Sequence, residues 1–226
     1  MKPRLVVLTG AGISQESGLR TFRDTDGLWE GYDVYEVASP QGWQKNPQLV
    51  LDFYNMRRKD VLAASPNAAH TGLAALEDKY DVQIITQNID DLHERGGSTN
   101  VLHLHGELTK IRSVRSEKRT YPYDADLKLG DIAADGGQLR PFIVWFGEAV
   151  PMIEKAAEIV SQADIFVIIG TSLNVYPAAG LIDATRGDIP KYLIDKTIPS
   201  VSGRHQIKTI EQPATLGVAQ LMKELL

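Results

Sequence analysis

Short strand-like runs alternate along this chain with longer segments whose apolar residues recur at helical spacing. Four runs are typical of buried strands: 5–8, 81–85, 164–169 and 191–194. Four segments are typical of helices: 47–64, 68–79, 152–162 and 213–226. Strands that alternate with helices form parallel sheets through right-handed crossovers. The pattern therefore predicts an α/β fold built on a doubly wound parallel sheet.

Small or polar residues follow each predicted strand at its carboxyl end. They are Gly10 after the first strand, Gln87 and Asn88 after the second, Gly170, Thr171 and Ser172 after the third, and Asp195 after the fourth. In doubly wound sheets, ligands bind at this edge. We therefore expect these segments to converge on one site.

The first strand runs into the glycine-rich sequence Gly10-Ala11-Gly12-Ile13-Ser14. Small residues at the start of a helix let backbone amides approach a pyrophosphate. The spacing departs from the common dinucleotide fingerprint, because the next glycine after Gly12 is Gly18. The loop alone thus predicts a nucleotide ligand and does not indicate a dehydrogenase.

Two regions interrupt the alternation of strands and helices. Residues 22–47 are rich in Asp, Gly and aromatic residues without clear periodicity. This favours a flexible loop that closes over a ligand, or a small subdomain, over an ordinary connector. Residues 111–137 combine basic residues, tyrosines and aspartates, and we expect a polar insertion there.

Composition narrows the class of protein. A chain of 226 residues that is 43% apolar can bury one large core. Its net charge of -5 argues against a nucleic-acid surface but is compatible with cationic, lysine-rich substrates. The absence of cysteine excludes disulfides, and no run reaches the roughly 18 apolar residues of a membrane span. The run 5–8 is too short for a signal-peptide core. We expect a soluble, cytoplasmic monomer that binds neither nucleic acid nor membranes.

Three histidines, His93, His103 and His105, lie close together in the sequence. His103 and His105 are expected to alternate on one strand and to face the same side, which would suit a metal. No HExxH spacing, cysteine or recognisable third ligand accompanies them, so we predict no metal. A general base is the better role for one of them, because imidazole titrates near neutral pH. His93 and His103 are interpreted as structural residues at the ends of elements.

Five ordered segments resemble the sirtuins, the NAD-dependent protein-lysine deacylases: GAGISQESGLRTFR, TQNIDDLHERGG, LHLHGEL, LRPFIVWFGE and GTSLNVYPAAGL. The resemblance covers nearly the whole chain. It implies a single catalytic domain, 1–226, whose Rossmann-type NAD-binding part spans about 1–30, 65–110 and 140–226. A small inserted module is expected at about 31–64 and 111–139. NAD would be a consumed substrate, and the partners would be acylated lysines in proteins or peptides.

The resemblance also implies which residues bind NAD. They are Gly10, Ala11, Gly12, Ile13, Glu16, Thr21, Phe22, Arg23, Trp29, Gln87, Asn88, Ile89, Asp90, His105, Gly170, Thr171, Ser172, Asp195, Lys196 and Ala214. Arg23 would lie near the phosphates, and Phe22 would cover the reacting ribose unless it fills the core. Asp195 stands where the family usually has asparagine, and its carboxylate can accept but not donate a hydrogen bond.

The implied chemistry assigns the catalytic roles to His105, Asn88 and Asp90. Asp90 would pair with the nicotinamide carboxamide, and Asn88 would contact the ribose. After nicotinamide leaves, the acyl-lysine oxygen attacks the ribose, and His105 activates a ribose hydroxyl onto the resulting imidate. Attack by water then gives lysine and O-acyl-ADP-ribose. Residues 22–47 would exclude water until that step.

Two side chains are expected to select the acyl group. Tyr54 and Arg57 lie three residues apart on a predicted helix and share a face, and a guanidinium can hold a carboxylate. A Tyr-x-x-Arg pair at this place resembles the bacterial type of sirtuin that removes succinyl or malonyl groups. A solvated helix face is the alternative interpretation.

The acyl-lysine itself is expected beside a peptide-binding strand at 144–148. Val144, Phe146 and Gly147 would line its tunnel, with Val175 on the opposite side. An ordinary buried strand is the other interpretation of this apolar stretch, and the two are compatible.

The expected module departs from most sirtuins in its metal site. Most family members hold a structural zinc on two cysteine pairs after the catalytic histidine, whereas this chain has no cysteine. We expect a zinc-free module stabilised by the packing of Tyr121, Tyr123 and Leu127.

Two other functions stay open from the sequence. The chain could be an NAD or ADP-ribose sensor without turnover, or a protein ADP-ribosyltransferase. A sensor has no need of His105 beside Asn88 and Asp90, nor of a hydrophobic tunnel.

Overall fold

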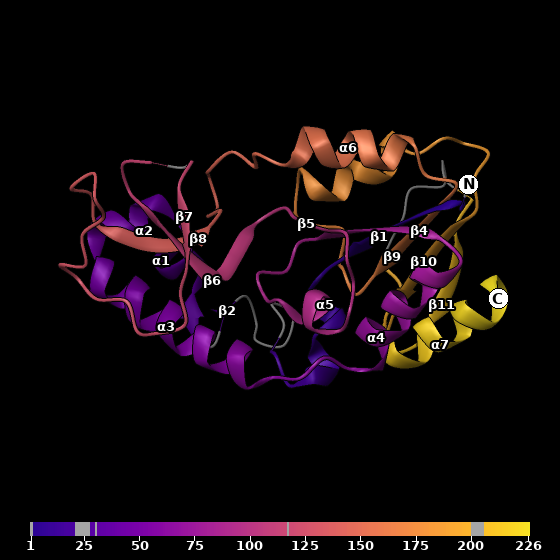
Figure 1. The fold of residues 1–226 in the computed structure, drawn as a ribbon, viewed down its shortest axis with the longest axis horizontal. Helices are drawn as coiled ribbons and strands as arrows, with labels where there is room; N and C mark the ends of the chain where they lie inside the picture. Colours follow the sequence, from indigo (N-terminus) through magenta and orange to yellow (C-terminus); the bar gives the residue numbers. More distant parts are fainter. Residues whose placement is uncertain (1, 21–27, 30, 117, 200–205) are drawn as a thin grey trace.

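The computed structural model describes residues 2–20, 28–29, 31–116, 118–199 and 206–226. It consists of a large sheet with helices on both faces and, beside it, a smaller module of helices around a second sheet (Figure 1). No helix in the described ranges is both long and apolar enough to cross a membrane.

The large sheet has six strands, all parallel, in the order β11-β10-β9-β1-β4-β5. The strands are β1 (Arg4–Thr9), β4 (Asp81–Thr86), β5 (Val101–His103), β9 (Ile165–Ile169), β10 (Lys191–Asp195) and β11 (Lys208–Glu211). β1 lies at the centre, where Leu5 pairs with Val82 on one side and Ile165 on the other. The predicted doubly wound α/β fold is confirmed.

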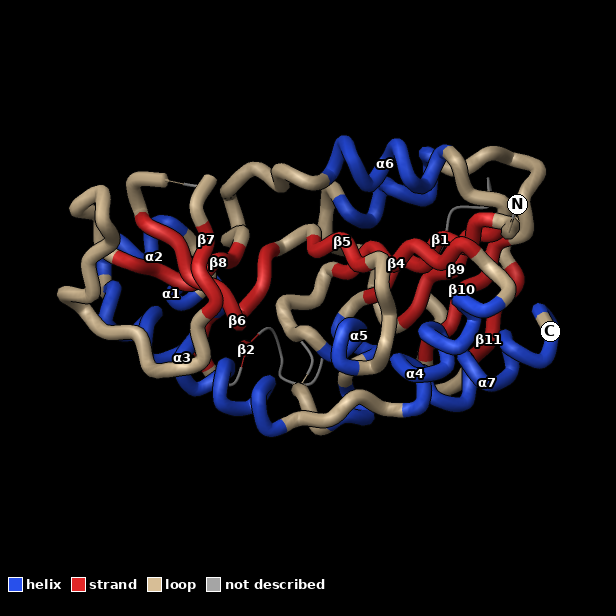
Figure 2. Tube along the Cα trace, in the orientation of Figure 1, coloured by secondary structure: helices blue, strands red, loops and turns tan. Residues whose placement is uncertain are grey.

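Both faces of this sheet are covered, which explains why its strands are almost continuously apolar. Leu5 and Val7 face α4 (Ala68–Ala75), η3 (Leu76–Asp78) and α7 (Ala214–Leu225). Val6 and Leu8 face the opposite layer, formed by α6 (Ile153–Ser161) and η4 (Ala178–Ala184). Figure 2 shows α6 on one side of the strands and α4 and α7 on the other. Each fully buried side chain of this kind contributes about 1.5–3 kcal/mol relative to exposure.

The smaller module combines three helices with an antiparallel sheet of order β7-β6-β8. Its elements are α1 (Val34–Val37), α2 (Pro40–Lys45), α3 (Pro47–Ala63), β6 (Gly106–Ser113), β7 (Thr120–Pro122) and β8 (Leu139–Ile143). A two-stranded ribbon of β2 (Leu28–Trp29) and β3 (Tyr32–Asp33) precedes α1. β6 and β8 extend beyond the expected insertion at 111–137 on both sides.

The described part of 22–47 is not a plain loop, because it holds α1 and α2. Their starts are capped by side chains: Asp33 accepts a hydrogen bond from the Tyr35 amide, and Ser39 accepts one from the Gly42 amide. Pro40 follows the cap directly, at the position where a helix tolerates proline best. Caps are local signals without periodicity, so these short helices escape a reading based on apolar spacing.

Packing between α3 and the sheet holds the module together. Leu127 is buried in a cluster with Leu51 of α3 and Ile111 of β6, and the partly buried side chain of Tyr123 packs against this cluster. The expected packing is thus present for Leu127 and Tyr123 but wrong for Tyr121, which is 40% exposed. Tyr121 lies on β7, an edge strand with all three residues exposed.

Buried polar side chains of α3 also bind β6 and the segment that contains Ala125 and Leu127. The Asn55 side chain donates to the Leu127 carbonyl and accepts from the Leu127 amide, both at 2.9 Å. Arg58 donates from Nε to the Leu108 carbonyl at 3.0 Å and from Nη1 to the Ala125 carbonyl at 3.0 Å. Since these groups are buried and bonded, they tie the insertion to α3 at defined positions.

We expect Leu127→Ala to lower the free energy of unfolding by about 2–4 kcal/mol, because it opens a cavity between α3 and β6. Urea denaturation followed by circular dichroism measures this change. The control is Leu129→Ala, whose side chain is 47% exposed and should change the stability by less than about 0.5 kcal/mol. Equal effects of the two substitutions would contradict this account of the module.

Candidate active site

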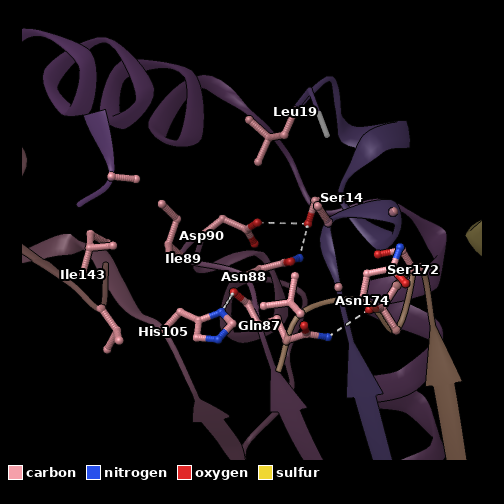
Figure 3. A pocket seen from close by; sticks show the side chains of 18 of the residues that line it. Ser14, Leu19, Gln87, Asn88, Ile89, Asp90, His105, Ile143, Ser172 and Asn174 are labelled. Atoms are coloured by element: carbon pink, nitrogen blue, oxygen red, sulfur yellow. Dashed lines mark hydrogen bonds between the residues drawn. The ribbon is translucent and has the colours of Figure 1, made fainter. Parts of the chain in front are cut away.

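A cavity of about 900 Å³ lies at the carboxyl edge of the large sheet and extends to α3 of the small module. Its walls include the segments that follow β1, β4, β9 and β10 (Figure 3). The following predicted site residues line it: Gly10, Ala11, Gly12, Tyr54, Arg57, Gln87, Asn88, Ile89, Asp90, His105, Val144, Phe146, Gly147, Gly170, Thr171, Ser172, Val175, Asp195, Lys196 and Ala214. The prediction that the segments after these strands converge on one site is therefore confirmed, although the segments lie far apart in the sequence.

Some predicted residues lie elsewhere. Ile13 is fully buried in the core cluster beneath α4 and α7. Glu16 accepts hydrogen bonds from the amide and hydroxyl of Thr215, at 3.0 and 2.8 Å, and so caps the start of α7. The structure does not place either side chain on the cavity wall. Thr21, Phe22 and Arg23 lie outside the described residues, as does the side chain of Trp29.

The glycine-rich loop after β1 packs directly on the end of β9. The Gly12 amide donates to the Gly170 carbonyl at 2.8 Å, and the Gly10 amide donates to the Ile169 carbonyl at 3.0 Å. A Cβ atom on Gly12 would lie 2.6 Å from the Gly170 Cα, so a side chain does not fit. These two amides hold the loop to the sheet, and the turn η1 (Ala11–Ile13) begins between them.

The loop after β4 is held by Ser14. The Asn88 side-chain amide donates to the Ser14 hydroxyl at 3.1 Å, and that hydroxyl donates to Asp90 Oδ2 at 3.0 Å. Burial raises the pKa of the Asp90 carboxyl, while hydrogen bonds from the Leu92 amide and Ser14 act against the shift. The sequence had given Ser14 no role. Ser14 follows the carboxyl end of β1, just as Gln87 and Asn88 follow that of β4. The same argument from strand ends could therefore have identified it.

His105 presents a basic nitrogen to the cavity. Its Nδ1 lies 2.9 Å from the Gln87 carbonyl, which can only accept, so Nδ1 carries the proton of the neutral ring. Nε2 is then the nitrogen with the free lone pair. Burial lowers the pKa of His105, opposed by this hydrogen bond. A neutral imidazole in this tautomer is suited to accept a proton.

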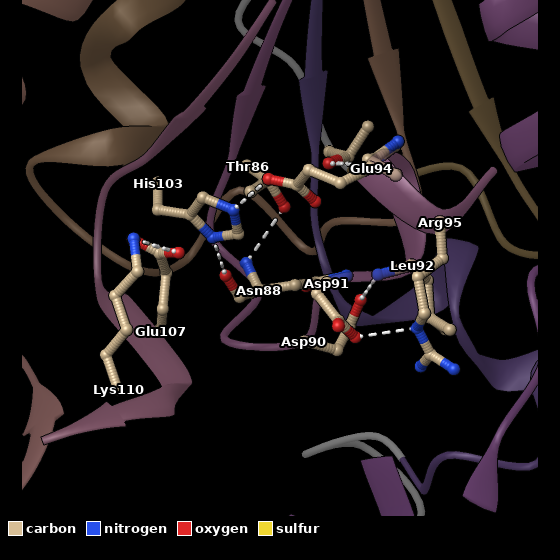
Figure 4. A network of polar contacts seen from close by, with 12 residues as sticks. Thr86, Asn88, Asp90, Asp91, Leu92, Glu94, Arg95, His103, Glu107 and Lys110 are labelled. Carbon is tan, nitrogen blue, oxygen red and sulfur yellow. Dashed lines mark hydrogen bonds and ion pairs between the residues drawn. The ribbon is translucent and has the colours of Figure 1, made fainter. Parts of the chain in front are cut away.

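His103 supports the same loop from outside the cavity (Figure 4). Its Nδ1 donates to the Asn88 carbonyl at 3.1 Å, and its Nε2 donates to Glu94 at 2.8 Å. Burial lowers the pKa of His103, but the hydrogen bond and charge of Glu94, the charge of Glu107 and the bond to Asn88 together raise the pKa overall. The expectation that His103 and His105 lie on one strand is wrong, because β5 ends at His103 and His105 lies in the turn before β6.

His93, on α5 (Leu92–Arg95), is buried and lies 3.0 Å from the Thr9 hydroxyl. Its placement agrees with the interpretation as a structural residue. Within the described ranges, no three His, Asp or Glu side chains gather in a way that could hold a metal ion.

The far wall of the cavity carries the expected acyl-selecting pair. Tyr54 and Arg57 of α3 are 0% and 5% exposed, so the interpretation of a solvated helix face is wrong. The Tyr54 oxygen accepts a hydrogen bond from Trp145 Nε1 at 3.1 Å. Arg57 lies 3.6 Å from Asp60, whose side chain is half-exposed. Burial raises the pKa of the Tyr54 phenol, so it keeps its proton.

The expected peptide-binding strand at 144–148 is a turn in this structure. β8 ends at Ile143, and Gly147 has φ +89°, which breaks an extended conformation. The Val144 amide donates to the His105 carbonyl at 2.9 Å, and the Phe146 amide donates to the Ala38 carbonyl at 2.9 Å. These bonds hold the segment between the turn at His105 and the end of α1 in the small module, along the cavity wall.

A doubly wound sheet with a cavity at its carboxyl edge is the arrangement in which many α/β proteins bind nucleotides. The model of the Sir2 family matches residues 10–177 of this chain. NAD-dependent protein deacylases of Helicobacter pylori (strain ATCC 700392 / 26695) and Bacteroides thetaiotaomicron are each 54% identical to it. Each match covers 98% of this chain and 97% of the relative.

Solved structures agree with these relatives. A Sir2 homolog in complex with NAD has a TM-score of 0.88 at 36% identity, and the match covers 99% of this chain and 90% of the other. A mutant Sir2 homologue in complex with ADP-ribose has a TM-score of 0.90 at 35% identity, with 99% and 92% covered. The chain belongs to the Sir2 family. Its predicted enzyme class, NAD-dependent protein deacylase, is confirmed by relatives that carry this name over almost the whole chain.

The tautomer and burial of His105 predict the pH dependence of turnover. With His105 as the predicted base, the neutral ring is the reactive form, and burial lowers its pKa below the ordinary histidine value of 6.5. The midpoint of the acidic limb of kcat/KM for an acetyl-lysine peptide should therefore lie below pH 6.5. An acidic limb centred above 6.5, measured at saturating NAD, would contradict the assignment of His105 as the base.

Proposed function

We propose that this Sir2-family chain removes acyl groups, acetyl and also succinyl or malonyl, from protein lysines, with NAD as a consumed co-substrate. The products would be nicotinamide, the free lysine and O-acyl-ADP-ribose. One observation carries the proposal: the basic nitrogen of His105 and the buried pair of Tyr54 and Arg57 belong to the same cavity. A nucleotide sensor would need neither group.

The sheet edge suits the dinucleotide. Asp195, at the end of β10, is buried on the cavity wall, where its carboxylate would accept hydrogen bonds from ribose hydroxyls. Gly170, Thr171 and Ser172 would line the adenosine side with Lys196 and Ala214. Sir2 homologues of the same fold have been solved with NAD and with ADP-ribose, which supports a nucleotide of this kind as the ligand. NAD bound there would supply the electrophilic ribose carbon and receive the acyl group.

The chain's own residues would then place and move the proton. His105 Nε2 would take it from a ribose hydroxyl, while the bond from Nδ1 to the Gln87 carbonyl fixes the ring. Asn88 and Asp90, joined through Ser14, would hold the ribose and the nicotinamide carboxamide. Val144, Phe146 and Val175 would line the path of the acyl-lysine. A site ordered before the substrate arrives loses little free energy to reorganisation during the reaction.

The charge at the far wall favours an acidic acyl group. Arg57 is a buried cation, and the Asp60 carboxylate, 3.6 Å away, lies toward solvent. A succinyl or malonyl carboxylate entering the cavity could take the planar guanidinium as a forked donor, with Tyr54 as a second donor. An acetyl group would use neither.

We expect Arg57→Met to lower kcat/KM for a succinyl-lysine peptide at least about 30-fold, because it removes one partner of a buried charge pair. For the matching acetyl-lysine peptide, kcat/KM should change by less than about threefold. The matched control is Lys59→Met on the same helix, an exposed residue paired with Asp126. Equal loss on both peptides would contradict the assignment of the acyl pocket.

We also propose that the small module needs no zinc. Support comes from the packing of Leu127 and the buried hydrogen bonds of Asn55 and Arg58, which fix the insertion to α3. Metal analysis of the purified chain should find no stoichiometric zinc, and EDTA should leave Tm unchanged. One tightly held zinc per chain would overturn this proposal.

A further inference from the structure

Trp145 is held on three sides beside the acyl-selecting pair. Its backbone amide donates to Glu148 Oε2 at 2.8 Å. The Arg140 guanidinium lies over its ring, with the central carbon 3.2 Å from the ring centroid. Trp43 contacts it with ring centroids 5.6 Å apart. Because Trp145 is 2% exposed, its ring has little freedom to turn.

Arg140 is itself fixed. It donates from Nη1 and Nη2 to the two oxygens of Glu148, at 2.8 and 3.3 Å, and from Nη2 to the Ile143 carbonyl at 2.9 Å. Arg112 lies 3.6 Å from the same carboxylate. Two parallel hydrogen bonds to one carboxylate fix the plane of the Arg140 guanidinium. Because this group stacks on the indole of Trp145, it also restricts the orientation of the indole.

The fixed indole of Trp145 makes one hydrogen bond to the side chain of Tyr54. The indole N–H of Trp145 can only donate, so Tyr54 must use its oxygen as the acceptor, at 3.1 Å. This bond does not use the O–H of the phenol itself. A carboxylate, which can only accept, is the complementary partner for such a group.

We propose that Trp145, held by Arg140 and Glu148, is a positioning residue that fixes Tyr54 for recognition of an anionic acyl group on lysine. The inference rests on the proposed removal of acidic acyl groups. It adds that selectivity depends on a third residue, which acts by holding Tyr54, in addition to the Tyr54 and Arg57 pair.

The test is Trp145→Phe, which removes the indole N–H but keeps an aromatic ring under Arg140. KM for a succinyl-lysine peptide should rise about three- to tenfold, the range expected for one lost hydrogen bond. The values of kcat and KM for the acetyl-lysine peptide should stay within about twofold. Trp43→Phe, the neighbouring tryptophan, is the matched control and should leave the ratio of the two activities unchanged.

A double-mutant cycle separates positioning from a structural role. In a Tyr54→Phe background, Trp145→Phe should have less than a twofold further effect on succinyl KM. The same loss in both backgrounds, or equal losses on both peptides, would overturn the inference. If Trp145→Phe folds poorly by its Tm, Arg140→Lys, which loses the planar stack, should give the same selective rise in succinyl KM.

The two levels of the proposal fail differently. A wild-type chain that removes acetyl but not succinyl or malonyl would overturn the acidic-acyl function and this inference together. A wild-type chain that removes succinyl, with a Trp145→Phe variant that leaves succinyl KM unchanged, would overturn the inference alone.

Discussion

The hydrogen bond from His105 Nδ1 to the Gln87 carbonyl is the interaction on which the site depends. It joins the loop after β4 to the turn after β5, and it decides which ring nitrogen is basic. The next carbonyl, of Asn88, accepts from His103, which Glu94 holds from the other side. Two successive carbonyls thus fix two histidines differently: the His105 ring lines the cavity with Nε2 as its basic nitrogen, and the His103 ring pairs with Glu94 and supports the loop.

The small module supplies the other half of the cavity, and α3 is its main support. One part of this helix carries Asn55 and Arg58 into the insertion, while Tyr54 and Arg57 line the cavity. Acyl selection and module stability are therefore built on neighbouring residues of a single helix. Arg57 and Arg58 are buried although the same helix has an exposed face, so hydrogen bonds and packing place them and not contact with solvent.

The strand ends were predictable from the sequence because a parallel sheet brings its carboxyl edges together whatever the side chains are. This reasoning placed Gln87, Asn88, Gly170 and Asp195 near one another, and they line one cavity. Ile13 and Glu16 were assigned through family likeness alone, and their actual partners, the core and Thr215, are tertiary contacts with no local signal. The roles of Ser14 and Trp145 depend in the same way on neighbours distant in the sequence. The helices α1 and α2 escaped prediction because caps, not periodicity, define them.

Mass spectrometry of paired acetyl-lysine and succinyl-lysine peptides, incubated with and without NAD, tests the central claim most directly, with a His105→Ala chain as control. The account predicts NAD-dependent loss of both acyl groups and formation of O-acetyl- and O-succinyl-ADP-ribose, absent in the control. Cleavage of NAD without any change in either peptide, or loss of acyl groups that does not require NAD, would contradict it.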